Sequence, residues 1–240
     1  MHRKRLPETV SAPRKTPSMR AVARSGYRKG EETRQRILDV ALKAFGEHSF
    51  RAVTTRQISE SAGVSLPTLQ YYFGSKEGLY LACAEAIVER YRSHTTGAAR
   101  KAAQALNDGC TAETARAHLK AVIGALAGLL VGSTEVERWA QFVARELRDP
   151  APAFEILYTS LWRPGVELTA RLFARILGSP EIDSAARIQA LLLISGLLAF
   201  QSGRSISLRT MQWSTIGREE LAMVLSVLDA QIDAIGCKKS

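Results

Sequence analysis

Residues 54–80 read TTRQISESAGVSLPTLQYYFGSKEGLY, and this stretch decides which fold the N-terminal part of the chain is expected to adopt. Thr54 followed by Gln57 forms a capping box, so a helix is expected to begin there. Gly63 stands where that helix needs a left-handed residue, and Ser65 is a good N-cap for the next helix. Two short helices joined by a glycine turn are typical of a helix-turn-helix unit, whose second helix enters a DNA major groove.

The apolar residues of these two helices predict which side is buried. Ile58 and Ala62 lie one turn apart, as do Leu69 and Phe73, and the two pairs are expected to pack against each other. A plain three-helix packing unit would show the same periodicity, but it would not require the glycine turn, the serine cap and the Tyr-Tyr-Phe-x-x-Lys ending together. The outward side chains predict a DNA-binding surface, with phosphate contacts from Thr54, Tyr71, Tyr72 and Lys76, base contacts from Arg56, Leu66, Pro67, Thr68 and Gln70, and further contacts from Thr55 and Ser65.

These residues resemble the TetR family of bacterial transcriptional regulators. Its members typically read Thr-x-x-x-Ile-Ala-x-x-Ala-Gly-Val-Ser, then an aromatic-Tyr/His-Phe ending and a lysine; here Ser59 replaces the usual alanine and Gln70 the usual first aromatic residue. The string at 71–84 and the segment RELRDP at 145–150, followed by Phe154 and Tyr158, are similar to the CecR-type branch of that family. The resemblance covers residues 31 to about 205. It implies an all-α chain with an N-terminal three-helix helix-turn-helix domain and a C-terminal helical domain for ligand binding and dimerisation.

The net charge of +10 is concentrated at the N-terminus of the 240-residue chain. Residues 1–30 hold nine Lys and Arg against one Glu, and three prolines interrupt them without any apolar helical stripe. We expect a disordered basic arm over residues 1–29, followed by a DNA-binding domain at 30–78 and a helical domain at 79–236. Three interpretations of the arm remain open. It is an extension that aids solubility, or the result of a start codon assigned too far upstream, or an arm that follows DNA phosphates or enters a neighbouring minor groove.

The sequence lacks the motifs of several other classes of protein, among them metal-binding proteins and common enzymes. Three cysteines without C-x-x-C spacing and four isolated histidines offer no metal site, and no nucleotide-binding loop or activated nucleophile is present. The sequence predicts no cofactor and no enzymatic activity. The scattered cysteines fit a reducing cytoplasm and no apolar core of a signal peptide is recognisable, so a cytoplasmic location is expected. An enzyme acting on an aromatic compound and a non-specific DNA-coating protein remain as alternatives; turnover of aromatic compounds would mark the first, and equal affinity for any duplex the second.

Helical periodicity continues beyond the helix-turn-helix unit. Breakers and caps predict helices over about 31–46, 75–92 and 114–131, a flexible joint at 93–113, a capping box formed by Thr134 and Glu137, and a long segment at 152–177 that Pro164 and Gly165 kink or split.

Six large rings between residues 139 and 173 predict a cavity for a planar aromatic effector, with an ordinary aromatic core as the alternative. The resemblance implies such a cavity in the C-terminal domain. Arginines nearby would fix a carboxylate or another acceptor on the effector. The expected ligand-binding residues are Trp139, Phe142, Arg145, Glu146, Phe154, Tyr158, Trp162, Phe173, Phe200 and Arg204.

Residues 181–202 are apolar nearly all round, so the helix there is expected to be buried on every side. Arg187 and Arg204 bound roughly sixteen residues, short of the ~20 needed to cross a bilayer, so no membrane contact is expected. Together with a helix at about 218–235 it would form a four-helix bundle across a two-fold axis, although the central helix of a monomer would look the same. The expected dimer interface is Ile188, Leu191, Leu192, Ser195, Leu198, Leu221, Leu225 and Leu228.

The sequence as a whole predicts a homodimeric regulator with two recognition helices on a pseudo-palindromic operator in double-stranded DNA. Ligand binding would favour a state with the wrong spacing between them, so we expect a repressor that a small aromatic effector releases.

Overall fold

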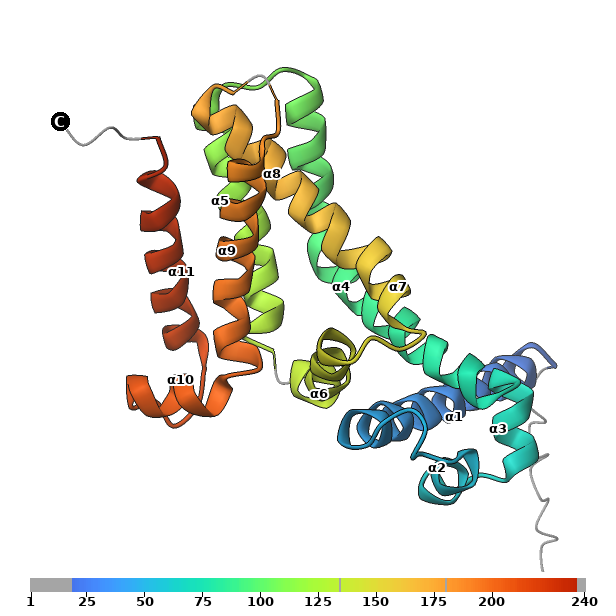
Figure 1. Cartoon of the computed structure of the whole chain (residues 1–240). Coiled ribbons are helices and arrows are strands. Elements are labelled where there is room, and N and C mark those ends of the chain that lie inside the picture. Colours follow the sequence, from blue (N-terminus) through green and yellow to red (C-terminus); the bar gives the residue numbers. More distant parts are fainter. Residues whose placement is uncertain (1–18, 134, 180, 237–240) are drawn as a thin grey trace, which may run out of the picture. The chain divides into compact units, whose positions relative to one another are not determined.

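The computed structural model describes residues 19–133, 135–179 and 181–236. All regular elements in these ranges are helical, as expected for an all-α chain (Figure 1). Residues 1–18 of the expected arm and Thr134 of the expected capping box lie outside the described residues. The elements are α1 (Met19–Glu47), α2 (Thr55–Ser61), α3 (Leu66–Phe73), α4 (Lys76–Asn107), α5 (Ala112–Leu130), α6 (Glu135–Arg148), α7 (Phe154–Leu157), the π-helical segment η1 (Tyr158–Trp162), α8 (Arg163–Leu177), α9 (Ser184–Gln201), α10 (Arg204–Met211) and α11 (Arg218–Asp233).

The chain divides into two compact units, up to Arg36 and from Ile37 onward. In the first unit α1 begins at Met19, so the prediction of disorder through residue 29 is wrong for residues 19–29. The last proline of the arm is Pro17, and no further proline interrupts the helix that follows. Exposed ion pairs one turn apart, such as Arg28 with Glu32 at 3.6 Å, add modest support to this helix.

In the second unit, the C-terminal half of α1 packs with α2 and α3 around a small apolar core. Ile58 and Ala62 are buried, as are Leu69 and Phe73, which confirms the inward face expected from the sequence. Gly63, between α2 and α3, has a φ of 63°, the left-handed value that its place in the turn requires. This packing holds α3 with its opposite face in solvent.

The fourth helix is continuous from Lys76 to Asn107, so the predicted end near residue 92 and the flexible joint at 93–113 are wrong. A single exposed glycine, Gly97, costs a helix only about 1 kcal/mol relative to alanine. The alanine-rich run after it favours helix, and the buried Ala102 fixes that run against the protein. The actual break is short, with Gly109 at a φ of 72° and Thr111 capping α5. The expected domain boundary at residue 78 falls inside α4 and stays a prediction.

The C-terminal helices pack on one another and on α4. Helix α5 packs against α4 and α8, and α8 packs against α9 (Figure 1). The expected break of the segment at 152–177 takes the form of a π-helical stretch, Tyr158–Trp162, that leads directly into α8 with Pro164 in its first turn. A proline is tolerated there because the first turn has no intrahelical N–H bond to lose. π-Helical stretches are rare and frequently occur at functional sites.

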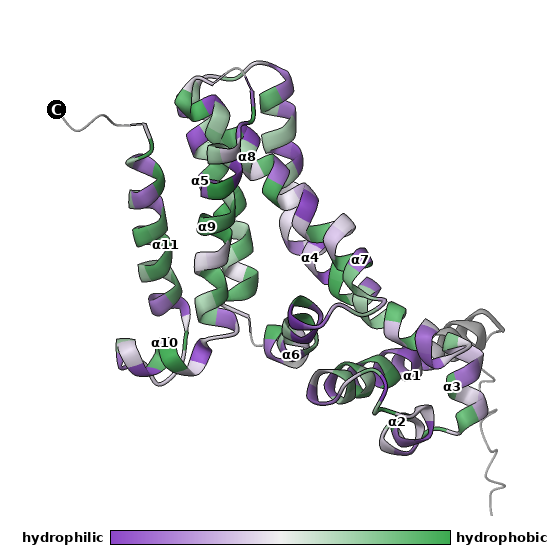
Figure 2. Ribbon diagram, viewed as in Figure 1, coloured by the Kyte–Doolittle hydropathy of each residue, from purple (hydrophilic) through white to green (hydrophobic). Residues whose placement is uncertain are grey.

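Helix α9 is apolar over most of its surface, as is much of α11 (Figure 2). The expectation that α9 is buried on every side is wrong for the single chain, because Ile188, Leu191 and Leu192 are 55%, 49% and 68% exposed. By length and composition Ser184–Gln201 is also the one helix of the described residues that is able to cross a membrane, against the sequence estimate, and 22% of it is buried. Core helices of soluble proteins satisfy the same two criteria, so length and composition alone are weak evidence for a membrane span.

Candidate DNA-binding surface and its contact with the C-terminal helices

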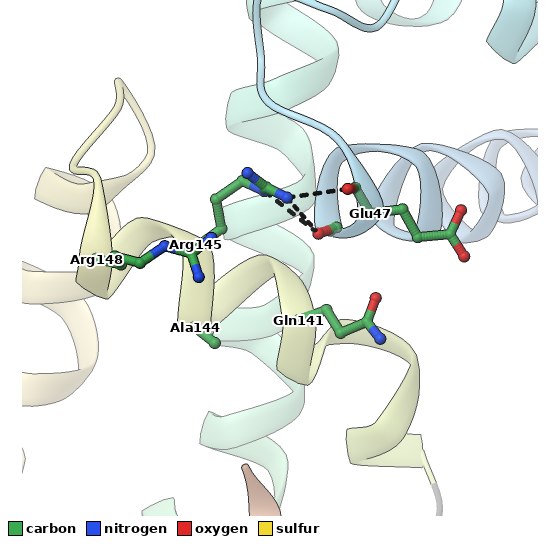
Figure 3. Close-up of a pocket in the computed structure, with 6 residues that line it drawn as sticks. Glu47, Gln141, Ala144, Arg145 and Arg148 are labelled. Atoms are coloured by element: carbon green, nitrogen blue, oxygen red, sulfur yellow. Dashed lines mark hydrogen bonds between the residues drawn. The ribbon is translucent and has the colours of Figure 1, made fainter.

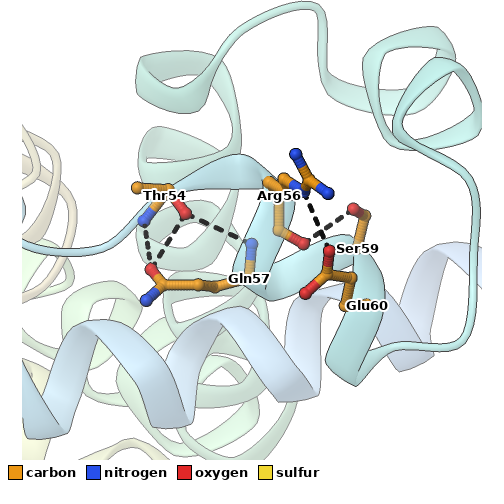
Figure 4. Close-up of polar contacts among 5 residues, drawn as sticks. All are labelled: Thr54, Arg56, Gln57, Ser59 and Glu60. Atoms are coloured by element: carbon orange, nitrogen blue, oxygen red, sulfur yellow. Dashed lines mark hydrogen bonds and ion pairs between the residues drawn. The ribbon is translucent and has the colours of Figure 1, made fainter.

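The start of α2 is fixed by the expected capping box (Figure 4). The backbone N–H of Gln57 donates to Thr54 Oγ1 at 3.2 Å, and the backbone N–H of Thr54 donates to Gln57 Oε1 at 2.9 Å. Ser59, which occupies a buried small position, donates its hydroxyl to the Arg56 carbonyl at 2.9 Å. The hydroxyl of Thr54 therefore caps the start of α2. Thr54 is exposed, and Thr55 beside it is half-buried.

The recognition helix α3 begins at a second cap. The Thr68 N–H donates to Ser65 Oγ at 3.2 Å, and the two hydroxyls are 2.8 Å apart. Pro67 lies in the first turn, where it fixes φ without loss of a hydrogen bond. These contacts hold the N-terminal turn of α3, the part of a recognition helix that meets base edges.

The outward face of α3 presents the side chains that the sequence assigned to DNA. Pro67 and Gln70 are exposed, and Tyr71 is 84% exposed, which is unusual for a large ring. Tyr72 is half-buried, and its ring meets that of Tyr71 edge-on with centroids 5.2 Å apart. Leu66 and Thr68 are half-buried on the same helix. This face of α3 thus presents an apolar ring from Pro67, an amide from Gln70 and the phenols of two tyrosines.

Two cations flank this face, and both have partners within the protein. Arg56 pairs with Glu60 at 3.0 Å, but both side chains are largely exposed, so the pair is weak and phosphate or a base can replace it (Figure 4). Lys76 Nζ donates to the Arg51 carbonyl at 3.4 Å and lies 4.7 Å from the centroid of the Phe50 ring. It sits at the N-terminus of α4, where backbone N–H groups also attract anions.

One glycine of this region was not singled out from the sequence. A Cβ on Gly78 would overlap the carbonyl oxygen of Phe73, the last residue of α3. Any side chain at 78 would therefore push α3 away from the start of α4. The glycine pair in GSKEG was the available signal for such a close approach.

Helix α6 touches the end of α1, and Arg145 makes the contact (Figure 3). Its guanidinium donates to the Gly46 carbonyl at 3.2 and 3.3 Å and to the Glu47 carbonyl at 3.0 Å. The last turn of α1 has no basic residue of its own, so α6 supplies the cation that a helix C-terminus favours. Arg145 was expected to bind the effector; its guanidinium is instead occupied by these carbonyls.

The backbones at this contact approach closely. A Cβ on Gly46 would lie 3.0 Å from Gln141 Cβ and 3.1 Å from the Phe142 nitrogen, so only glycine fits without displacement. Beside the contact is an open groove of about 430 Å³ lined by Gly46, Glu47, Gln141, Ala144, Arg145 and Arg148.

A second polar contact joins α6 to α4. Tyr80 donates its hydroxyl to Glu146, whose carboxylate is fully buried and also accepts from the Ala151 N–H at 3.2 Å. Burial and this hydrogen bond raise the pKa of Tyr80 far above its ordinary value, so the phenol stays protonated. The Tyr80 ring packs against Phe45 of α1 and Phe142 of α6, with centroids 4.8 and 4.9 Å apart. Glu146 is therefore bound to Tyr80 rather than free for a ligand.

The rings expected to line one cavity contact different partners. Trp139 is fully buried against Tyr91 of α4, 5.6 Å between centroids, and Phe142 is buried against Tyr80. Phe154 forms a second group with Tyr158 and Trp162, at 6.0 and 5.5 Å. Phe173 is buried in α8, and Phe200 stacks with Trp213 at 6.5 Å.

Arg204, expected as a cation at the mouth of the cavity, also has partners. It pairs with Glu137 at 3.0 Å and donates to the Val131 carbonyl at 3.3 Å, and its side chain is mostly buried. Both arginines assigned to an effector carboxylate are thus engaged by the protein.

The residues assigned to the dimer interface divide between surface and interior. On α9, Ile188, Leu191, Leu192 and Ser195 are exposed and Leu198 is half-buried. On α11, Leu228 is only 8% exposed; Leu225 lies beside Gly124 of α5, and Leu221 lies beside Gly132, which follows α5. The apolar side chains that α11 leaves exposed are Met223 and Val227, at 49% and 59%.

No group of three His, Cys, Asp or Glu side chains suited to a metal ion occurs in the described ranges. Burial raises the pKa of the Cys83 thiol, so this cysteine is unreactive.

Comparisons with known proteins agree with this architecture. The family model of bacterial regulatory proteins of the TetR family matches residues 37–83, and that of the C-terminal domain of the HTH-type transcriptional dual regulator CecR matches residues 115–236. The chain is 30% identical to the dual regulator CecR of Shigella flexneri over 211 residues, 86% of this chain and 92% of that protein. It is 44% identical over 63 residues to the regulatory protein RaaS of Mycobacterium tuberculosis, which covers 26% of this chain and 29% of that one.

Solved structures with the same fold are transcriptional regulators as well. One from Pseudomonas aeruginosa PAO1 superposes with a TM-score of 0.60 at 17% identity, covering 87% of this chain and 92% of that one. A TetR-like regulator from Rhodococcus sp. RHA1 gives 0.54 at 20% identity, covering 84% and 96%. The similar proteins are regulators rather than enzymes, and the chain belongs to the TetR family of DNA-binding transcriptional regulators, with a C-terminal domain of the CecR type.

Proposed function

We propose that this regulator is a repressor that binds a pseudo-palindromic operator as a homodimer and is released by a small aromatic effector. The observation that carries the proposal is the double contact of α6, through Arg145 to the end of α1 and through Glu146 to Tyr80 of α4. One helix of the C-terminal domain thereby bonds two of the helices that hold the helix-turn-helix unit.

The operator contacts follow from the exposed face of α3. Gln70 and the first turn of α3 meet base edges, while Tyr71, Tyr72 and Lys76 meet phosphates. Gln70 stands where the family usually has a ring, and an exposed amide can bond adenine through two hydrogen bonds. The basic arm adds attraction to phosphates that does not depend on base sequence.

The exposed apolar faces of α9 and α11 support the dimer. Ile188, Leu191 and Leu192 on α9 and Met223 and Val227 on α11 are each about half or more exposed. Exposure of five large apolar side chains to water is unfavourable for a monomer. A symmetric dimer would bury the same set on both copies. The apolar length of α9 is thereby assigned to a protein interface in the cytoplasm rather than to a membrane.

Effector binding acts on the equilibrium between two arrangements of α6. We assign the arrangement with α6 bonded to α1 and α4 to the operator-binding state. An effector that fits better when α6 has moved weakens those bonds, and it shifts the equilibrium only by its difference in affinity for the two arrangements.

Sequencing of the genomic fragments that the purified protein retains tests the operator part of the proposal. We expect an inverted repeat with half-site centres about one helical turn apart. Equal retention of all fragments would contradict a sequence-specific regulator.

A promoter reporter carrying the recovered site tests the direction of control. Expression should rise on deletion of the regulator. The name of the Shigella relative includes dual regulation, so a fall in expression is the outcome that would refute repression. Planar aromatic compounds should quench tryptophan fluorescence and release the recovered DNA.

A further inference from the structure

Trp139 carries the one buried side-chain nitrogen or oxygen that has no hydrogen-bond partner in the part of the chain that the structure describes. The residue is 0% exposed, and its indole Nε1 lies within the apolar interior. A buried tryptophan N–H usually finds an acceptor, and each exception in a native protein needs an explanation such as a ligand or an ordered water.

The surroundings of Trp139 place this donor in the C-terminal domain, away from the bonds to α1. Its ring packs against Tyr91, while Phe142, less than one turn further along α6, packs against Tyr80. Trp139 and Phe142 of α6 therefore contact different rings of α4, and Trp139 contacts the one further from the helix-turn-helix unit. The π-helical segment Tyr158–Trp162, rich in rings, packs against α4 as well.

The charged groups expected to fix an effector are engaged elsewhere. Arg145 is bonded to the carbonyls of Gly46 and Glu47, and Arg204 is paired with Glu137. Neither arginine is free to compensate a carboxylate brought into this interior, and burial of an uncompensated carboxylate is strongly unfavourable. The unpaired neutral donor remains, and it suits a neutral acceptor such as a ring nitrogen, carbonyl or ether oxygen.

We infer that the effector is a neutral aromatic compound with a hydrogen-bond acceptor, which it presents to Trp139 Nε1 where this residue of α6 packs against Tyr91 of α4. This inference rests on the proposed function and narrows its effector. It also places the ligand six residues from Arg145 on the same helix, about 9 Å along the helix axis. A displacement of Trp139 toward the acceptor is therefore carried by α6 to the contact with α1.

The probes are naphthalene, quinoline and 1-naphthoate, which share a two-ring shape and differ in their polar group. Quinoline adds one ring-nitrogen acceptor to naphthalene without adding charge, and 1-naphthoate adds a carboxylate. The donor is already desolvated in the free protein, so the bond to quinoline should raise affinity about 5- to 100-fold over naphthalene. 1-Naphthoate should bind more weakly than quinoline.

The assay uses the full chain with ¹⁵N-labelled indoles, since three tryptophans give three resolvable N–H signals. Quinoline should move the signal of Trp139 downfield, the direction of a new hydrogen bond. Trp139→Phe assigns that signal, and Trp213→Phe is the matched control that should leave quinoline affinity unchanged. Replacement of Trp139 by benzothienylalanine, which keeps the two-ring shape without an N–H, should abolish the preference for quinoline.

Four results would overturn the inference. They are equal affinities for quinoline and naphthalene, stronger binding of 1-naphthoate, binding of none of the probes, and a Trp139 signal that stays at a hydrogen-bonded position throughout because a buried water holds it. Retention of operator DNA by the protein without probes is measured in parallel. If that retention is normal, the failure concerns the effector site alone, whereas loss of sequence-specific retention would refute the proposed function itself.

Discussion

Removal of the Arg145 guanidinium is expected to disconnect α6 from α1 while leaving both helices folded. The side chain makes three N–H contacts of 3.0–3.3 Å to two carbonyls at the end of α1. Hydrogen bonds from a charged donor contribute about 1.5–3 kcal/mol, and because Arg145 is half-buried we take about 1.5–2 kcal/mol for the whole group. In Arg145→Ala the operator-binding arrangement should lose this amount, which corresponds to roughly a 10- to 30-fold loss of operator affinity.

Fluorescence anisotropy with labelled operator DNA measures this loss at fixed salt. Arg148→Ala is the matched control, since Arg148 lines the same groove and is exposed. It removes the same charge, so a decrease common to both variants would reflect general electrostatics alone. Arg145→Lys keeps the charge but not the planar fork, and it should recover only part of the affinity.

The reasoning about α6 would be refuted by an Arg145→Ala protein that binds operator within twofold of the native protein and is released by the same effector concentration. A large fall in melting temperature together with an unchanged ratio of specific to non-specific binding would also contradict it. In that case Arg145 would act as a plain structural contact.

Further expectations concern the other contacts. Lys76→Ala should weaken binding to all sequences and lower the salt slope by about one per subunit, whereas Gln70→Ala should cost about 1–3 kcal/mol at one base pair, both read from affinity at several salt concentrations and base substitutions; an unchanged slope would remove Lys76 from the phosphate contacts. Leu192→Glu, at a position exposed in the single chain, should give a folded monomer by ultracentrifugation that binds the operator poorly. A variant that stays dimeric would place the interface elsewhere. Tyr80→Phe should lower the free energy of unfolding, measured by urea denaturation, by about 1–3 kcal/mol, because the buried carboxylate of Glu146 loses a donor. An unchanged free energy would mean that this hydrogen bond does not contribute to stability. Deletion of residues 2–18 should reduce low-salt affinity for any duplex more than operator discrimination, and equal low-salt affinity would show that the arm does not reach DNA.

Local signals in the sequence were sufficient for the helix-turn-helix unit. The capping box of Thr54, the turn at Gly63 and the cap at Ser65 each depend on residues within a few positions, and the structure has all three. The same reasoning fails for 93–113, where a glycine and polar residues predict a joint. There the helix-favouring alanines and the burial of Ala102 prevail, and burial depends on partners distant in sequence.

The candidate site shows the same division between local and distant information. The sequence marks Trp139 and Glu146 of α6 as candidate ligand-binding residues, but it does not say which helices they contact. Arg145 could not be distinguished from an effector-binding cation, because its partners are backbone carbonyls nearly a hundred residues away. The leucines of α11 were assigned to the dimer for a similar reason, since an amphipathic helix shows an apolar face without showing whether its own chain or a second copy covers it.

The unbroken course of α4 has a consequence for how an operator is measured. Its 32 residues make a rod of about 48 Å, so a tilt of 5° at one end displaces the other end by about 4 Å. If two copies tilt in opposite senses, the separation of their recognition helices changes by about 8 Å, more than twice the 3.4 Å rise of one base pair. A hinge within residues 93–113 would have absorbed such a rotation before it reached the DNA. Without one, a tilt of 5° caused by a ligand of two rings alters the separation of the recognition helices by more than two base-pair rises, so the effector controls which spacer length between half-sites the dimer fits.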